Sequence, residues 1–309
     1  MAQRLLMSGH LLEVFTPYRH DEKRMLEVLE KALDMGCYRN VELTTFQIPE
    51  YQKRVRNLLE SNHVTALTYV APYLGEHKLS MCDLDEAGRQ AAIGLAKKHA
   101  ELSAAAGYNR YGIPSGNYPG DALKDEAMKR MTDTMIEMGE FCAKLGMEVT
   151  IEPLDRYTFK KQLIGPIKEV VEWFGPIHEA CPNVYIHWDS AHEALGGIDL
   201  LESIECAKAY TAQIHLCDAI VDPSHPCFGD LHKDVARAPE WKTEGVLTPE
   251  MGAALLKAAA SFDKPAGLKN DVHVSVEVMG HPGDDLWLKE ENARKFLLRC
   301  AELAGVTLG

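Results

Sequence analysis

Short apolar runs alternate with longer amphipathic stretches along the whole chain. The apolar runs favour β-branched and aromatic residues and predict strands at 5–9, 40–44, 64–72, 108–114, 147–153, 183–189, 211–218 and 272–280. Apolar residues at helical spacing predict helices at 20–36, 49–61, 83–106, 121–145, 165–181, 199–207, 248–261 and 289–304. Several of these helices close on a glycine, namely Gly36, Gly107 and Gly146.

Eight β-then-α units in 309 residues have the size and order of a (β/α)8 TIM barrel, in the α/β class. A doubly wound sheet is the competing architecture, but no G-x-G-x-x-G follows the first strand. No break in composition marks a second domain, so we expect residues 1–309 to form one TIM-barrel domain.

The connection after the seventh predicted strand, residues 218–247, is far longer than the ~2 to 6 residues usual between barrel elements. Such a loop over the carboxyl-end mouth is a candidate lid or specificity loop. A surface excursion or a subunit contact would explain its length equally well.

Strand residues alternate between two faces, and in a barrel one face meets the helices while the other points inward. In the sixth predicted strand the apolar Ile186 and Trp188 alternate with the polar His187, and the fifth, seventh and eighth strands alternate in the same way. The inward sets carry, near the carboxyl ends where barrel sites lie, Glu152, Asp189, His215 and Glu277.

Three carboxylates converging inside a barrel are costly when unpaired, because desolvation and mutual repulsion oppose their ionisation. A divalent cation removes that cost. The oxygen-rich ligand set suits Mn²⁺, Mg²⁺ or Co²⁺ better than a structural zinc, although Zn²⁺ also accepts such ligands. We therefore expect one divalent metal ion, with Mn²⁺ favoured, against the alternative of separate salt bridges and hydrogen bonds.

The formal charge of -13 weighs against nucleic acid or an anionic membrane surface as the main partner and leaves small polar ligands open. The eight cysteines form no C-x-x-C pair, the N-terminus has no signal-like apolar stretch, and no apolar run approaches ~20 residues. These features favour a cytoplasmic protein. We expect a homo-oligomer, with a hetero-oligomeric complex as the alternative.

The segments MGCYRNVEL, IEPLDRY, HWDSAH, QIHLCD and VSVEVMG resemble the motifs of the xylose isomerase-like TIM barrels. That superfamily includes sugar isomerases and epimerases, D-tagatose 3-epimerase-like enzymes, inosose dehydratases and endonuclease IV. The resemblance implies that Glu152, Asp189, His215 and Glu277 bind the metal and that His192 binds substrate or handles a proton. It further implies that Glu152 and Glu277 act as base and acid around a metal-stabilised enediolate.

The chain departs from the epimerase pattern at several positions. Asp155 and Thr158 stand where an asparagine and a glutamate are typical, and no arginine follows His215 at the usual spacing. Substrate contacts must therefore differ, and the remaining candidates are Arg156, His10, His225 and His232.

The segment after His215 also holds Asp230 and His232, which resemble the pair that binds an additional zinc in endonuclease IV. The ends of the third and fourth strands, TYVAPYLG and YGIPSGN, lack the histidines that a trinuclear cluster needs. Nuclease activity is therefore disfavoured, and we interpret the pair as loop residues that could face the substrate.

The leading hypothesis is a divalent-metal-dependent sugar isomerase or epimerase that abstracts a proton next to a carbonyl. The main alternative is a lyase acting on a 3-oxo-sugar derivative, either a dehydratase or a C-glycoside-cleaving catalytic subunit. A non-catalytic sugar-binding barrel is the further alternative, and the presence of both glutamates and His192 argues against it.

Overall fold

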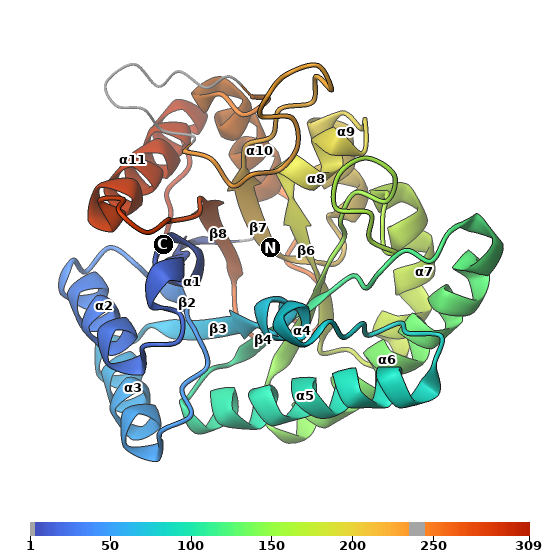
Figure 1. Cartoon of the computed structure of the whole chain (residues 1–309). Coiled ribbons are helices and arrows are strands. Elements are labelled where there is room, and N and C mark those ends of the chain that lie inside the picture. Colours follow the sequence, from blue (N-terminus) through green and yellow to red (C-terminus); the bar gives the residue numbers. More distant parts are fainter. Residues whose placement is uncertain (1–3, 235–244) are drawn as a thin grey trace.

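The computed structural model describes residues 4–234 and 245–309. Eight parallel strands close into one barrel in chain order, and helices surround it (Figure 1). The strands are β1 (Leu5–Gly9), β2 (Asn40–Glu42), β3 (Thr65–Tyr69), β4 (Arg110–Pro114), β5 (Glu148–Glu152), β6 (Val184–Asp189), β7 (Thr211–Cys217) and β8 (Val272–Glu277). The predicted (β/α)8 fold is confirmed.

The outer helices occupy the predicted stretches. They are α2 (Glu22–Asp34), α3 (Pro49–Asn62), α5 (Glu86–Ala105), α6 (Lys124–Lys144), α7 (Ile167–Ala180), α9 (Leu200–Ala207), α10 (Pro249–Ser261) and α11 (Leu286–Ala304). Each turns an apolar stripe onto the barrel, as in α2, where Met25, Leu29 and Ala32 are fully buried. None of the helices in the described part of the chain is long and apolar enough to cross a membrane.

Three short helices at the carboxyl ends of strands were not predicted, because four to seven residues are too few to show helical periodicity. They are α1 (Leu11–Val14), α4 (Ala71–His77) and α8 (Ser190–Leu195). The strand expected at 64–72 is wrong at its end, since Pro72 lies in the first turn of α4. The strand expected at 272–280 ends at Glu277.

Register relates the inward side chains of β6, β7 and β8 to one another. Asp189 pairs with His215, and Glu277 pairs with Cys217, two residues beyond His215. On the outward face, Trp188 is fully buried and its Nε1 donates to Ser203 Oγ in α9 at 2.8 Å. The apolar and polar residues that alternate in the sequence therefore correspond to the outward and inward side chains of the folded strands.

A buried ion pair fills the amino-terminal end of the barrel. The Arg110 guanidinium donates to Glu148 Oε2 from Nε at 3.2 Å and from Nη2 at 2.8 Å. Its Nη1 donates to the Ala212 carbonyl at 2.8 Å and lies 3.0 Å from His273 Nδ1. This layer of side chains closes the amino-terminal end of the barrel. A ligand site can therefore open only at the carboxyl ends of the strands.

The long connection after β7 folds back toward the mouth of the barrel. Ile220 and Gly229 form an antiparallel bridge, and the Met279 amide after β8 donates to the His232 carbonyl at 2.8 Å. The second half of the predicted lid segment, residues 235–244, lies outside the described residues. The described part brings Asp230 and His232 next to the end of β8.

Candidate metal and catalytic site

Four side chains at the ends of β5 to β8 form a compact cluster. Glu152, Asp189, His215 and Glu277 each offer one ligand atom, and these atoms all lie within 4.8 Å of one another. Parity alone predicted their convergence. Among the described residues, the buried Asp189 Oδ2 has no hydrogen-bond partner, while Asp189 Oδ1 accepts from the amides of Ala191 and His192. A free buried oxygen beside two other carboxylates and an imidazole fits a divalent cation.

The pKa values of the carboxyl groups in the cluster also support a bound cation. Burial raises the pKa of Glu152 to about 7, with a further contribution from Glu277, although His192 acts in the opposite direction. Burial likewise raises the pKa of Asp189 to about 6. Burial opposes ionisation of Glu277 as well, but His232 and His215 outweigh it and hold its pKa well below the usual range. A cation bound among these carboxylates would remove the cost of their burial.

The His215 ring is fixed from both sides. Its Nδ1 lies 2.8 Å from Glu277 Oε2, and its Nε2 lies 2.9 Å from Oε2 of the fully buried Glu42. Glu42 also accepts from Tyr69 Oη and from Ser8 Oγ, each at 2.8 Å. A histidine ligand commonly has its second nitrogen on a carboxylate in this way, which sets the ring orientation.

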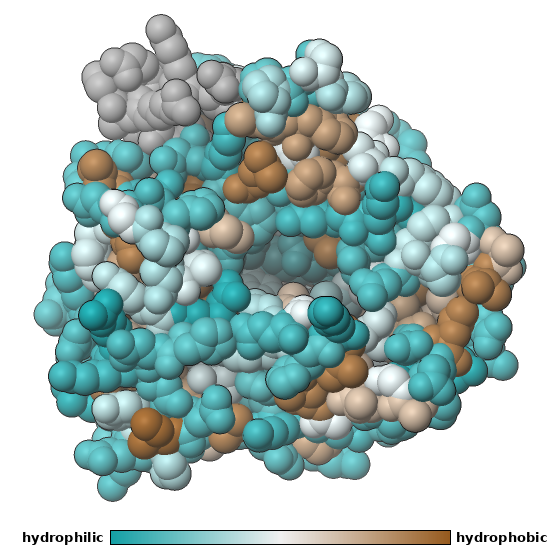
Figure 2. Space-filling model, viewed as in Figure 1, coloured by the Kyte–Doolittle hydropathy of each residue, from teal (hydrophilic) through white to brown (hydrophobic). Residues whose placement is uncertain are grey.

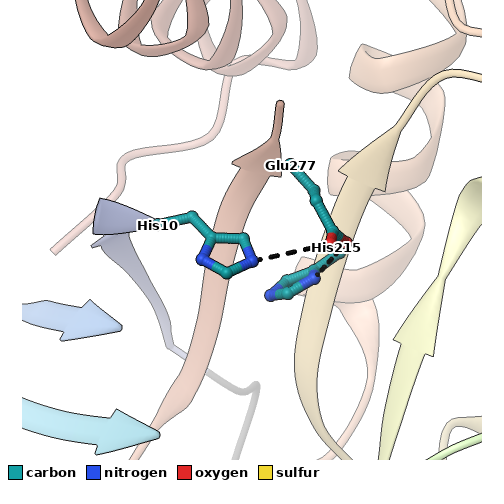
Figure 3. Close-up of side chains that lie close together, drawn as sticks. All are labelled: His10, His215 and Glu277. Carbon is teal, nitrogen blue, oxygen red and sulfur yellow. Dashed lines mark hydrogen bonds and ion pairs between the residues drawn. The ribbon is translucent and has the colours of Figure 1, made fainter. Parts of the chain in front are cut away.

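His10, immediately after β1, completes this side of the site (Figure 3). Its Nε2 lies 3.6 Å from Glu277 Oε1 and its Nδ1 lies 3.4 Å from Glu42 Oε2. The His10 and His215 rings are 4.7 Å apart between centroids. The structure thus brings His10 into direct contact with the predicted ligand set.

His192 and His187 occupy different places, as parity suggested. His192 Nε2 lies 3.6 Å from Glu152 Oε1, and its Nδ1 lies 3.7 Å from Asp155 Oδ2. Burial opposes its protonation, but Asp189, Asp155 and Asp230 together raise the pKa of His192 to about 9. His187 is one inward step deeper, with its ring centroid 3.9 Å from that of His215.

The departures from the family motif have a local explanation. Asp155 stays buried beside His192 and accepts from the Lys160 amide, so it can orient the histidine. Thr158 faces elsewhere, since its Oγ1 donates to the Leu195 carbonyl at 2.8 Å. The carboxylate that approaches His192 Nδ1 therefore comes from the position that usually carries asparagine.

The loop after β7 contributes a second group of charges. His232 Nδ1 lies 2.9 Å from Glu13 Oε1 and 3.1 Å from Glu277 Oε1, and its Nε2 lies 2.9 Å from Asp230 Oδ2. Lys160 Nζ lies 2.8 Å from the same Asp230 oxygen. His232 has φ +48°, in the left-handed region of backbone conformation that residues other than glycine rarely adopt.

A cavity of about 250 Å³ opens onto the cluster and forms the central hollow of Figure 2. His10, Glu152, His192, His215, His232 and Glu277 line it. The polar lining residues that sequence reasoning missed are Glu13, Arg19, Tyr69 and Lys160. Tyr69 ends β3, where a parity argument could have found it, whereas the others lie in a four-residue helix or in loops, which carry no periodic signal.

Two of the predicted substrate residues lie outside the described lining of this cavity. Arg156 donates from Nε to the Leu163 carbonyl at 2.9 Å and from Nη1 to Glu169 Oε2 at 2.8 Å, and it borders a neighbouring cavity of about 170 Å³. His225 lies in a turn of the long loop, where its Nδ1 accepts from the Cys227 amide at 3.0 Å. Their assignment to substrate stays a prediction.

The protein is a closed (β/α)8 barrel with this acidic cluster at its carboxyl-end mouth, which places it in the general class of TIM barrels. The family model for the xylose isomerase-like TIM barrel matches residues 29–242, so the chain belongs to that family. No curated protein sequence matches the chain at a significant level.

Among solved structures, similar folds include a D-tagatose 3-epimerase-like protein, with 15% identity over 87% of this chain and 90% of that chain and a TM-score of 0.65. The 3-keto-D-glucoside 4-epimerase of E. coli has 13% identity over 95% of this chain and 98% of that chain and a TM-score of 0.63. The IOLI protein with a bound zinc atom has 16% identity over 97% of this chain and 98% of that chain and a TM-score of 0.66.

Proposed function

We propose that the protein is a divalent-metal-dependent enzyme that removes a proton next to the carbonyl of a sugar or sugar derivative, as an isomerase or epimerase. The observation that carries this proposal is the pair of glutamates, Glu152 and Glu277, which come from different strands and both line the cavity. Two carboxylates beside one substrate carbon can take a proton and return it.

Glu152, Asp189, His215 and Glu277 would hold the metal, and Mn²⁺ is our expectation because three of the four ligands are carboxylates. When bound, the ion would polarise the substrate carbonyl and acidify the neighbouring C–H bond. The structure of the IOLI protein with zinc supports a metal in this fold, without fixing its identity here.

The roles of the side chains follow from their surroundings. Glu152 lines the cavity at the end of β5, beside His192, and would accept the proton from the substrate carbon. Glu277, held by His232, His215 and His10, would return a proton to the substrate. His192, whose Nε2 lies 3.6 Å from Glu152 Oε1, would donate a hydrogen bond to a substrate oxygen beside Glu152.

The names of two structural neighbours, a D-tagatose 3-epimerase-like protein and a 3-keto-D-glucoside 4-epimerase, support epimerisation of a sugar carbonyl compound. Elimination from a 3-oxo-sugar would begin with the same proton transfer and end with loss of a group from the next carbon. The products therefore separate the leading proposal from the lyase alternative.

The test is solvent exchange in deuterated water. Metal-free protein would be loaded with Mn²⁺, Mg²⁺, Co²⁺ or Zn²⁺ and incubated with ketoses and 3-oxo-glycosides, and deuterium would be located by NMR. We expect metal-dependent incorporation next to the carbonyl, with the rate lowered at least ~10²-fold in Glu152→Gln and Glu277→Gln. Glu172→Gln, an exposed change on α7, is the matched control. Absence of metal-dependent exchange with every compound would refute the proposal.

A further inference from the structure

The cavity at the mouth of the barrel is divided into a charged side and an apolar side. The charged side comes from the ends of β7 and β8, the segment after β1 and the loops that carry Lys160 and His232. The opposite side follows mainly β3, β4 and β5, and we call it the apolar wall. It consists of Leu12, Ala71, Pro72, Ile113, Pro114 and Leu154.

The apolar wall is open to the cavity. Leu12 comes from α1 and packs against Leu67 and Tyr69 of β3. Pro72, Pro114 and Leu154 are half-buried, and Ala71 is exposed, so their apolar atoms face space that a ligand can fill. The hydroxyl of the adjacent Tyr69 is already committed to Glu42 at 2.8 Å.

The side chains of the wall can neither donate nor accept a hydrogen bond. A substrate hydroxyl pressed against them would lose its water partners, at a cost of roughly five- to a hundredfold in affinity. An apolar substituent in the same place would gain affinity by leaving water. A free hexose carries hydroxyls around most of its ring and suits this division poorly.

Among the described residues, the lysine and the arginine that line the cavity both lie near a carboxylate. Lys160 Nζ lies 2.8 Å from Asp230 Oδ2, and Arg19 Nη2 lies 3.6 Å from Glu13 Oε2. Because each of these two cations already lies near a carboxylate, a dianionic phosphate would have to compete with that carboxylate.

We propose that the substrate is amphiphilic: an oxo-sugar ring that carries an aryl or alkyl aglycone, with the carbonyl at the four-residue cluster and the aglycone on the apolar wall. The placement of the carbonyl end rests on the proposed function. The placement of the aglycone rests on the wall alone.

The test compares methyl and phenyl 3-oxo-β-D-glucosides, which differ only in the aglycone. Dissociation constants would be measured by calorimetry and kcat/KM by solvent deuterium exchange, with Mn²⁺-loaded protein. We expect the phenyl compound to bind about tenfold or more tightly. In Leu154→Asn this ratio should fall toward one, and in the control Leu298→Asn, an exposed change on α11, it should stay unchanged.

Equal binding of the two glucosides, or a preference for the methyl compound, would overturn the inference, and so would an unchanged ratio in Leu154→Asn. Exchange with either glucoside would leave the proposed function intact in those cases. Conversely, a phenyl preference that Leu154→Asn removes, without deuterium exchange for any compound, would support the apolar wall and reject the proposed chemistry.

Discussion

Glu193, next to His192 in α8, gives the sharpest stability prediction of the structure. Its carboxyl is buried behind the cluster and accepts a hydrogen bond from Ser203 Oγ at 2.7 Å. Burial raises the pKa of Glu193 to about 7, although the bond from Ser203 and the nearby His192 act in the opposite direction. In the unfolded chain a glutamate titrates at about 4.3. The folded state therefore binds a proton that the unfolded state has lost between these two values.

The sign of the pH dependence follows from that difference. Because the folded pKa is raised, the stability that the neutral carboxyl contributes is complete below the unfolded pKa and is lost as pH rises through about 7. At 1.36 kcal/mol per pKa unit, raising the pH from 5 to 8 should cost roughly 2 to 3 kcal/mol of unfolding free energy. Glu193→Gln is neutral throughout and should escape this loss.

The assay is urea unfolding of the metal-free protein at several pH values, with chelator present so that metal binding does not contribute. The unfolding free energy of Glu193→Gln minus that of the unmodified protein should rise by about 2 to 3 kcal/mol between pH 5 and pH 8. Glu179→Gln, an exposed change on α7, is the control and should give a flat difference. A flat or falling difference for Glu193→Gln would refute the reasoning.

Three further predictions concern the barrel interior, the metal and the loop. Arg110→Met removes the guanidinium partner of the buried Glu148 carboxylate and should lower the free energy of unfolding in urea by about 3 to 5 kcal/mol. The double variant Arg110→Met/Glu148→Met should recover part of this loss. A loss below about 1 kcal/mol in the single variant would contradict the importance of this pair. Addition of Mn²⁺ at one hundred times its Kd should stabilise the metal-free protein against thermal unfolding by about 2.7 kcal/mol. Asp189→Asn should sharply reduce this stabilisation by Mn²⁺. An undiminished stabilisation in the variant would place the metal elsewhere. His232→Asn keeps a residue type that tolerates positive φ but loses the imidazole contacts to Glu13 and Glu277. We therefore expect kcat/KM for deuterium exchange to fall about tenfold or more without loss of thermal stability. An unchanged kcat/KM would exclude His232 from the reaction.

The four-residue cluster was predictable because regular strands constrain it twice. Alternation decides which side chains point inward, and parallel register decides which of them share a level, as in the pairing of Asp189 with His215. Neither step needs more than the sequence and the assumption of a closed barrel. The same argument places His187 one inward step deeper than Asp189, and its ring lies beside His215 and Glu152.

The rest of the site could not be predicted in this way. Glu13 lies in a four-residue helix, and His232 reaches Glu277 only because a long loop returns across the mouth with one residue at positive φ. Loop conformation depends on tertiary contacts, such as the bond from the Met279 amide to the His232 carbonyl, and no local periodicity encodes them. Arg156 shows the converse, since its place beside the β5 motif suggested substrate, yet its guanidinium bonds Glu169 and Leu163.

This division between strands and loops bears on how the protein would select a substrate. The cluster that we propose to activate a carbonyl lies on β5 to β8, whereas the apolar wall comes from Leu12 in α1, the start of α4, the end of β4 and the segment after β5. Changes in those segments can alter the shape and polarity of the cavity without replacing Asp189 or His215. Substrate preference should therefore respond to substitutions in the wall, while metal affinity should respond to substitutions in the strands.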